Sequence, residues 1–451
     1  MLLHDAAHKV EKFLSGWRFD PTLVMPGFLL LLVLFAAITD PAVISASFFM
    51  IVAFSPLWLP FFLGTALWLA WMHYVRYQFW FSRKRTLLQI QLPAEVTKSP
   101  AAMEFFLVSI YSTGSETTFL HRFWGGGFRP NWSLEIASNE GRINFYIYGL
   151  KIWQTAVEAR IYGQYPEAKI TEVDDYVTKV PFNLTDYDIW GAEYKKGDIG
   201  ALPIKTYVDF ELDKNTDTPE VTADPLTNIL EIMNDMGKDQ YMWVQYIIKA
   251  RSNEEWYGIY DKSFDTYKDS AKKRIREIMA GAAARAQLVL KESDVVEGKM
   301  NALLTDGEKK ILEAIEHSMT KNLYECGIRA LYISKREKFE GINGAFMYRL
   351  FEFVKKQNFN SLNGTRGMVA FDFPWEDFRN IRENFIKKLL FFHYRHRAFF
   401  YVPYDQVPVF LNVEELATLW HFPNSSVKTP GLDRVPSKSA GAPSNLPVLP
   451  Q

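Results

Sequence analysis

The sequence predicts an α+β protein that begins with a transmembrane helical hairpin. Two observations predict the hairpin: residues 23–72 contain one charged side chain, Asp40, and basic residues flank this stretch on both sides. The third observation, strand-like alternation mixed with helix-start signals after residue 85, predicts the α+β body. We expect two successive ferredoxin-like (βαββαβ) units, the second with a helical insertion. The predicted parts are a cytoplasmic segment at 1–22, the hairpin at 23–75, an α+β domain at 86–180, a second at 181–423 with its insertion near 253–302, and an extended proline-rich tail at 424–451.

The apolar stretch is long enough for two membrane spans of roughly 20 residues each. Because Lys and Arg lie at both of its ends, both ends of the hairpin are expected in the cytoplasm. Aromatic side chains cluster at the second exit, which is typical of a membrane–water boundary. Either Asp40-Pro41 or Ser55-Pro56 can form the turn, and a single long span is the alternative. The sequence therefore predicts a multi-pass protein of a bacterial-type cytoplasmic (inner) membrane, with its soluble domains in the cytoplasm.

The first α+β unit is predicted from alternation and from helix-start signals. Ser99-Pro100 provides an N-cap followed by a proline at the first helical position. Thr155 and Glu158 have the spacing of a capping box. The predicted elements are a strand at 88–92, a helix at 101–111, strands at 133–137 and 143–148 joined by a turn at 138–141, a helix from 155 to about 163, and a strand at 169–173.

The second unit is predicted from the same kinds of signal. Asp224-Pro225 begins a helix that Gly237 stops, and Thr305 with Glu308 makes a capping box. A charged, alanine-rich region between them shows no strand pattern and is interpreted as a helical insertion or a mobile excursion. The predicted elements are a strand at 204–212, a helix at 224–236, a strand at 242–249, the insertion at 262–301, a helix from 305 to about 323, a strand at 328–334 and a helix at 345–355.

Composition argues against several classes of function. The 51 Lys and Arg residues nearly balance the 52 Asp and Glu residues, so the net charge does not favour nucleic acid as the main partner. Cys326 is the only cysteine, which excludes an intrachain disulfide and favours a buried thiol. The glycine triplet 125–127 with Arg129 could cradle an anion, but its neighbours favour a bent loop. The sequence contains no complete phosphate-binding P-loop, and we expect no catalytic residue, cofactor or metal site.

One basic stretch, Lys387–Arg397, interleaves cations with aromatic residues. Such a pattern suits phospholipid head groups or a nucleic acid, so a nucleic-acid-binding membrane protein is an alternative function. The other interpretation is the solvated face of a helix whose Phe391 and Phe392 are buried. The candidate contacts with an anionic partner are Lys387, Lys388, Arg395 and Arg397.

The segment Phe410–Pro423 reads Phe-Leu-Asn-Val-Glu-Glu-Leu-Ala-Thr-Leu-Trp-His-Phe-Pro. It resembles the segment that precedes the motor domain in conjugative, type IV secretion-type ATPases of the TraC and HerA–FtsK kind. Further pieces, between about residues 87 and 447, are similar in their order to the amino-terminal, non-motor half of a membrane-anchored relative of those ATPases. These pieces are Ser99–Glu104, Ser133–Ile136, Val157–Pro166, Asp224–Leu226, Thr305–Tyr332 and Pro443–Pro447.

The resemblance implies an anchor and adaptor rather than a motor, because the chain has no P-loop and stops where the motor would begin. Its expected function is a non-enzymatic, membrane-anchored assembly subunit of a type IV secretion or conjugation-like machine. Its expected partners are the lipid bilayer, a separate P-loop ATPase, and further copies of itself. The alternative for Leu411–Leu419 is a strand and helix that close the second α+β unit. The candidate docking residues are Leu411, Glu414, Glu415, Leu416, Leu419, His421 and Pro423.

Overall fold

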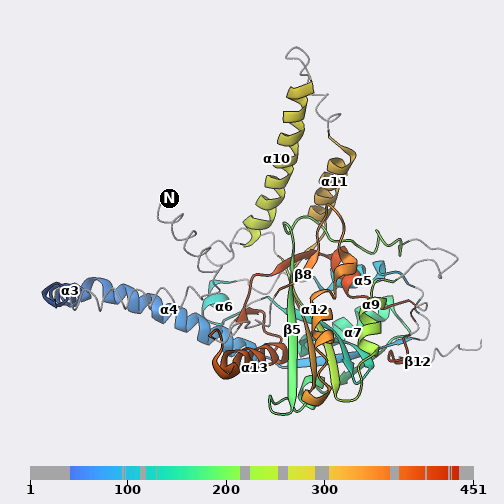
Figure 1. Ribbon diagram of the computed structural model, residues 1–451, viewed down its shortest axis with the longest axis horizontal. Coiled ribbons are helices and arrows are strands. Elements are labelled where there is room, and N and C mark those ends of the chain that lie inside the picture. Colours follow the sequence, from blue (N-terminus) through green and yellow to red (C-terminus); the bar gives the residue numbers. More distant parts are fainter. Residues whose placement is uncertain are drawn as a thin grey trace, which may run out of the picture. The chain divides into compact units, whose positions relative to one another are not determined.

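The computed structural model describes residues 41–93, 96, 98–111, 118–127, 129–213, 224–251, 263–289, 304–365, 375–401, 404–424, 427 and 429–435. The chain divides into two units, Met1–Tyr74 and Val75–Gln451. The predicted cytoplasmic segment at 1–22, the first arm of the predicted hairpin and the end of the predicted tail lie outside the described residues. Figure 1 shows the second unit as a sheet with helices packed on it.

Two apolar helices begin the described chain: α3 spans Pro41–Ala53 and α4 spans Ser55–Ser82. The break between them lies next to Pro56, which lacks the N–H that a continuous helix would use. At 1.5 Å per residue α4 is about 42 Å long, more than the roughly 30 Å hydrocarbon core of a bilayer. Among the described residues α4 alone is long and apolar enough to cross a membrane, judged by length and composition. The hairpin and its orientation stay predictions.

A ten-stranded sheet, counted over the described residues, forms the centre of the second unit. Its strands pair in the order β12-β1-β3-β2-β6-β7-β5-β8, with β4 also pairing β1 and β11 also pairing β7. Every pair is antiparallel except β1 with β12. The strands are β1 (Arg85–Pro93), β2 (Asn131–Asn139), β3 (Arg142–Leu150), β4 (Lys169–Val173), β5 (Tyr187–Lys196), β6 (Gln240–Ala250), β7 (Leu323–Lys335), β8 (Leu362–Thr365), β11 (Val409–Asn412) and β12 (Arg434–Val435), and a separate ribbon pairs β9 (Phe400–Tyr401) with β10 (Tyr404–Asp405).

The two predicted α+β regions share this one sheet. Strands β1 to β4 take the order β4-β1-β3-β2, and strands β5 to β8 take the corresponding order β8-β5-β7-β6. The halves join where β2 pairs antiparallel with β6 along nine residues, Asn131–Asn139 against Lys249–Tyr241. The hydrogen-bonded ladder therefore continues without a break from one region of the sequence to the other.

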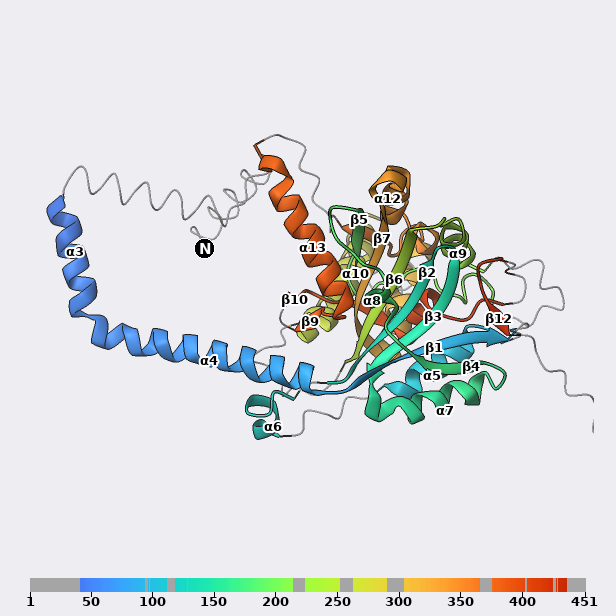
Figure 2. The same cartoon turned by 90° about the horizontal axis from the view of Figure 1, so that it is seen from below.

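Helices cover both faces of the sheet, as Figure 2 shows from below. On one face α5, α7, α9, α12 and α14 pack over Leu134, Phe145, Val244 and Ile328. On the opposite face α8 and α13 pack over Trp243 and Leu331. The helices of this unit are α5 (Ala101–Ile110), α6 (Phe119–Phe123), α7 (Gln154–Gln164), α8 (Tyr176–Lys179), α9 (Thr227–Asn234), α10 (Ser263–Val289), α11 (Asp306–Thr320), α12 (Gly341–Tyr348), α13 (Ile381–Arg395) and α14 (Val413–Leu419).

Helices α10 and α11 form a pair that projects from the body (Figure 1). Within the described residues the pair is tied to the body at its base, where Tyr267 and Ala271 of α10 and Ile315 of α11 are buried with Ala201 and Leu202. The sequence predicted α11, and α10 agrees with the helical one of the two interpretations of its region. It also predicted the start of α11, where Thr305 and Glu308 form the capping box with both hydrogen bonds present.

Four local predictions are wrong. Residues 204–212 do not form the predicted strand. The first strand of the second region is instead β5, which the sequence analysis missed. Gly191 and charged residues interrupt the alternation of β5. Thr155 and Glu158 do not form a capping box, since α7 begins one residue earlier without a side-chain cap. The N-cap of α5 is Pro100 in place of Ser99. A continuous helix over 345–355 is also replaced by α12 and a short 3-10 turn, Glu352–Val354.

Candidate functional site

The segment that carries the family resemblance folds as β11 and α14. β11 pairs with the start of β7, Leu411 opposite Tyr324, and so extends the sheet. Asn412 then caps α14 through a complete capping box with Glu415. All seven residues of α14 are buried, which is unusual for a helix that contains two adjacent glutamates.

Each glutamate of α14 is held by partners from elsewhere in the chain. Glu415 accepts a hydrogen bond from the backbone of Ile204 at 2.9 Å and forms an ion pair with Lys196 at 2.8 Å. Glu414 accepts a hydrogen bond from the hydroxyl of Thr206 at 2.6 Å and pairs with Lys321 at 2.6 Å. Burial disfavours the charged form of Glu414, but the bonds from Lys321 and Thr206 outweigh it and lower the pKa of this carboxyl.

Two more polar side chains of the segment bind the same region. The backbone N–H of Tyr207 donates to Thr418 at 2.8 Å. The Nε2 atom of His421 lies 3.1 Å from Asp224, a buried carboxylate just before α9. Burial raises the pKa of Asp224, but the interaction with His421 outweighs it and the net pKa is lowered. The polar residues of the motif therefore fasten the loop at 199–212 and the start of α9 to the body.

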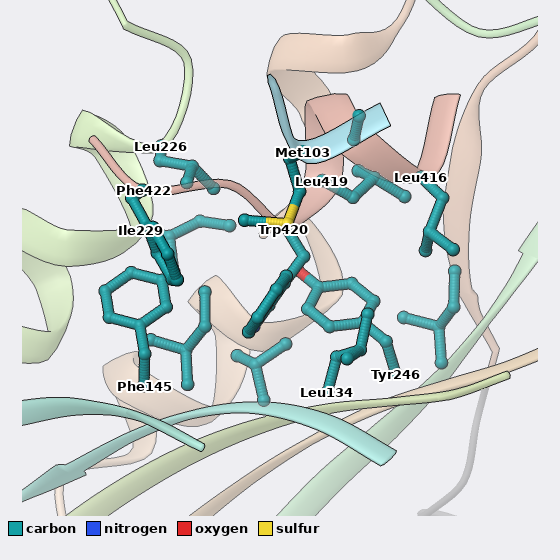
Figure 3. Close-up of a cluster of buried hydrophobic side chains, with 14 of the residues drawn as sticks. Met103, Leu134, Phe145, Leu226, Ile229, Tyr246, Leu416, Leu419, Trp420 and Phe422 are labelled. Carbon is teal, nitrogen blue, oxygen red and sulfur yellow. The ribbon is translucent and has the colours of Figure 1, made fainter. Parts of the chain in front are cut away.

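The apolar side chains of the motif fill the core between helices and sheet. Figure 3 shows Trp420 between Phe145 on the strand side and Met103 of α5, with Leu416 and Leu419 beside it. Phe422 packs edge-to-face on Phe145, with 5.6 Å between ring centroids. This segment therefore binds the first half of the sheet as well as the second.

These contacts correct the docking prediction. All seven candidate docking residues are buried, so their side chains present no surface to another protein. The strand-and-helix interpretation of the segment agrees with the structure, although α14 joins both halves rather than closing the second alone. The residues concerned are Leu411, Glu414, Glu415, Leu416, Leu419, His421 and Pro423.

The basic stretch at the end of α13 divides into buried and exposed cations. Lys387 is buried and pairs with Asp188 at 2.6 Å and Glu383 at 2.8 Å. Arg397 is buried and pairs with Glu135 at 2.9 Å and with Asp175. The prediction of an anionic partner at these two residues is wrong, because both side chains are buried and form ion pairs with carboxylates of the same chain. Lys388 and Arg395 are exposed.

Arg397 belongs to a buried polar network between α13 and the sheet. The hydroxyl of Tyr176 donates to Glu135 at 2.9 Å and lies 2.8 Å from the hydroxyl of Tyr394. Burial opposes the charge on Arg397, but Glu135 and Asp175 outweigh it and raise the pKa of the guanidinium. The network ties α8, α13 and β2 together.

A row of polar side chains continues across the strands beneath α13. Glu135 is opposite Gln245, Gln245 opposite Arg329, and Arg329 opposite Glu193. Arg329 is fully buried and donates to the carbonyl of Ala398, while its Nε and Nη1 atoms have no hydrogen-bond partner within the described part of the chain. The sequence analysis missed this row, because a charge at alternate strand positions is typical of a solvated face.

His393 reaches this row from α13. Its ring packs on that of Tyr404, with 4.1 Å between centroids, and its Nε2 atom has no hydrogen-bond partner among the residues described. Burial, with a smaller contribution from Arg329, lowers the pKa of His393 to about 4. Over the described residues no group of three or more His, Cys, Asp and Glu side chains is placed to hold a metal ion. Cys326 is buried, as the sequence predicted.

The glycine triplet 125–127 lies against the last turns of α4. A Cβ atom on Gly126 would lie 2.2 Å from the carbonyl oxygen of Val75, and the φ angle of Gly126 is +66°. A Cβ atom on Gly127 would meet the ring of His121 at 2.3 Å. Glycine is therefore required here for close packing. Arg129 is buried and donates to the carbonyl of Ala250 at 3.2 Å, so it does not complete an anion cradle.

Helix α4 passes into the body with two residues between its end at Ser82 and the start of β1 at Arg85. The guanidinium of Arg85 stacks on Trp80 of α4, 3.7 Å from the ring centroid. Burial lowers the pKa of Arg85 to about 10, and it remains charged at neutral pH.

No protein-family model and no curated protein sequence matches this chain.

Proposed function

We propose that this protein is a non-enzymatic membrane anchor and adaptor. The observation that carries the proposal is the junction between α4 and β1, where a helix long enough to cross a bilayer continues into the sheet after two residues. The polar clusters of the body support an architectural role, because their groups mostly pair with one another. We further propose, on the resemblance of residues 410–423, that the machine it serves is of the type IV secretion or conjugation kind and that a separate P-loop ATPase binds it.

We place the ATPase contact on the pair α10–α11. The segment 411–423 has no exposed face with which to dock, whereas the pair projects from the body and, in its described part, packs on the body at its base. Its sides carry exposed cations such as Lys272, Lys273 and Arg276. A long charged helix that packs on little of its own chain suits a polar protein–protein interface.

The test is affinity purification of the tagged full chain after mild detergent extraction. We expect a P-loop ATPase to copurify. Replacement of residues 273–309 by a short Gly-Ser linker removes the projecting part of the pair and leaves its base, so the ATPase should be lost while the unfolding temperature of the body is kept. A stable chain that copurifies without an ATPase would exclude the adaptor function, and an unchanged ATPase yield from the shortened variant would exclude the contact.

We also infer that each half of the sheet is a ferredoxin-like unit. The strand orders β4-β1-β3-β2 and β8-β5-β7-β6, with helices in the crossovers, support this inference. In the second half α10 and α11 would then be an insertion in the hairpin between β6 and β7. An experimental structure with another strand order would contradict it.

A further inference from the structure

Helix α13 has two apolar faces, of which only one is covered. Leu390 and Tyr394 face the sheet and are buried. Ile381, Phe385, Leu389 and Phe392 follow one another at spacings of 4, 4 and 3 residues and are 62%, 64%, 37% and 42% exposed. At 100° per residue these four side chains fall within an arc of about 80°. We call them the outer stripe of α13.

The outer stripe continues beyond the N-terminus of the helix. Phe378 is 69% exposed. It is held in place because the carboxylate of Asp377 accepts hydrogen bonds from the backbone of Arg382 and Glu383, each at 2.8 Å, and so fixes the first turn. An ordered row of large apolar side chains on a water-facing helix is typical of a surface that binds something apolar.

Along α13 itself, the exposed charges beside the stripe are cations. Lys388 and Arg395 are exposed and lie on one edge of the stripe by the helical periodicity. Glu383 is the only carboxylate within α13, and it faces inward to pair with Lys387. Apolar side chains in a narrow arc with Lys and Arg beside them are the pattern of a helix that lies in the membrane–water interface.

A second exposed apolar patch lies on α6. Phe119, Leu120 and Trp124 are 54%, 67% and 57% exposed, and the ring of Phe119 packs on that of Phe123. Thr118 caps this short helix by accepting a hydrogen bond from the backbone of His121. The side chains therefore have a defined position in the body.

Both patches adjoin the last turns of α4. His121 of α6 packs edge-to-face on Phe79, with 6.0 Å between ring centroids. At the end of α13, His396 packs on Phe392 at 4.2 Å and on Phe81 of α4 at 5.9 Å. Figure 2 shows α6 and the C-terminal end of α13 beside this end of α4. Two exposed cations, Arg83 and Lys84, follow directly.

We infer that α6 and the outer stripe of α13 bind the surface of the bilayer that α4 crosses, with anionic phospholipids paired to Lys388 and Arg395. The inference rests on the proposed membrane anchor, and the contacts with Phe79 and Phe81 are the reason to assign the patches to lipid. The body then has two attachments: α4, which retains it, and the interfacial side chains, which set its orientation.

The test uses the full chain in liposomes of phosphatidylcholine with phosphatidylglycerol. A cysteine is introduced at Phe385, or at Phe346 as a matched control, and labelled with an environment-sensitive fluorophore; the native Cys326 is buried. Phe346 is also a large, exposed apolar residue, but its helix α12 covers the opposite face of the sheet. We expect bromine-labelled lipids to quench the probe at residue 385 several-fold more than the probe at residue 346.

Two further arms separate lipid from other occupants. With phosphatidylcholine alone, or with the double variant K388E/R395E, quenching at residue 385 should fall. Quenching by lipid that is equal at residues 385 and 346 would overturn the inference. So would a probe at 385 that is shielded from water yet unaffected by bromine-labelled lipid, because a second copy or another protein would then cover the stripe.

Failure of the anchor gives a different result. Extraction of the liposomes at alkaline pH releases a chain that does not cross the bilayer, and this outcome would remove the proposed function and the inference together. A chain that resists extraction while its probe at residue 385 stays in water would retain the anchor and exclude only the interfacial contact.

Discussion

Helices α13 and α14 both come from stretches that sequence analysis proposed as contact surfaces, and they differ in what they do with their side chains. In α14 all seven residues are buried and both glutamates have partners within the chain. In α13 one face is buried and the outer stripe is exposed. Charged residues in a sequence motif can therefore be buried in the core, while a row of apolar residues can lie on the surface.

The largest effect is expected at Glu415. Replacement by Ala removes the partner of buried Lys196 and the acceptor for the backbone of Ile204, so it should destabilise the body by about 3–5 kcal/mol. Denaturant unfolding in detergent, followed by tryptophan fluorescence, measures this. A loss below about 1 kcal/mol would mean that the contacts of Glu415 with Lys196 and Ile204 contribute little to the stability of the body.

Two arginines at the end of α13 give a matched pair. Arg397→Ala leaves Glu135 buried without its guanidinium and should also cost about 3–5 kcal/mol. Arg395→Ala, two residues away and exposed, should change stability by less than about 0.5 kcal/mol. The same unfolding assay compares them. Equally small effects of the two substitutions would show that the stretch is a uniformly solvated face.

The inward face of α13 should make stability depend on pH. The pKa of His393 is lowered to about 4, from the 6.5 of an unperturbed side chain, chiefly by burial. Between these values the unfolded chain binds more protons than the native one, so the contribution is complete above pH 6.5 and is lost as the pH falls towards 4. Between pH 6.5 and 4 the free energy of unfolding should therefore fall by about 1–2 kcal/mol less in His393→Gln than in the wild type. Thermal unfolding at a series of pH values measures this difference. If the variant shows the same pH dependence of stability as the wild type, His393 is not the group responsible for it.

The smallest effect on stability is expected on the outer stripe. Phe385→Ser removes little buried surface and should change the free energy of unfolding by less than about 0.5 kcal/mol in detergent. A loss of 2 kcal/mol or more would mean that the side chain packs on the protein, and the contrast between the two faces of α13 would disappear.

Local signals in the sequence predicted most helices and strands. The capping box at Thr305 and the edges of β4 depend on neighbouring residues, and each is found where the pattern places it. The charged, alanine-rich region contains α10, in agreement with its helical interpretation. β5 was missed because its pattern is interrupted at Gly191. The strand expected at 204–212 was wrong because this loop is fastened by side chains of Glu414, Glu415 and Thr418, some 200 residues away.

The sequence by itself determined that its N-terminal region contains an apolar stretch long enough to cross a membrane, the α+β class and the balance of charge, because these follow from composition and short-range periodicity. Only the tertiary structure decided which charged side chains are exposed to solvent and which are buried in ion pairs. Glu135 alternates with Leu134 and Ile136 as a solvated residue does, yet α13, more than 240 residues later, covers that face, and Arg397, which follows the helix, pairs with Glu135. Burial depends on what the rest of the chain places over a surface, and no local pattern contains that information.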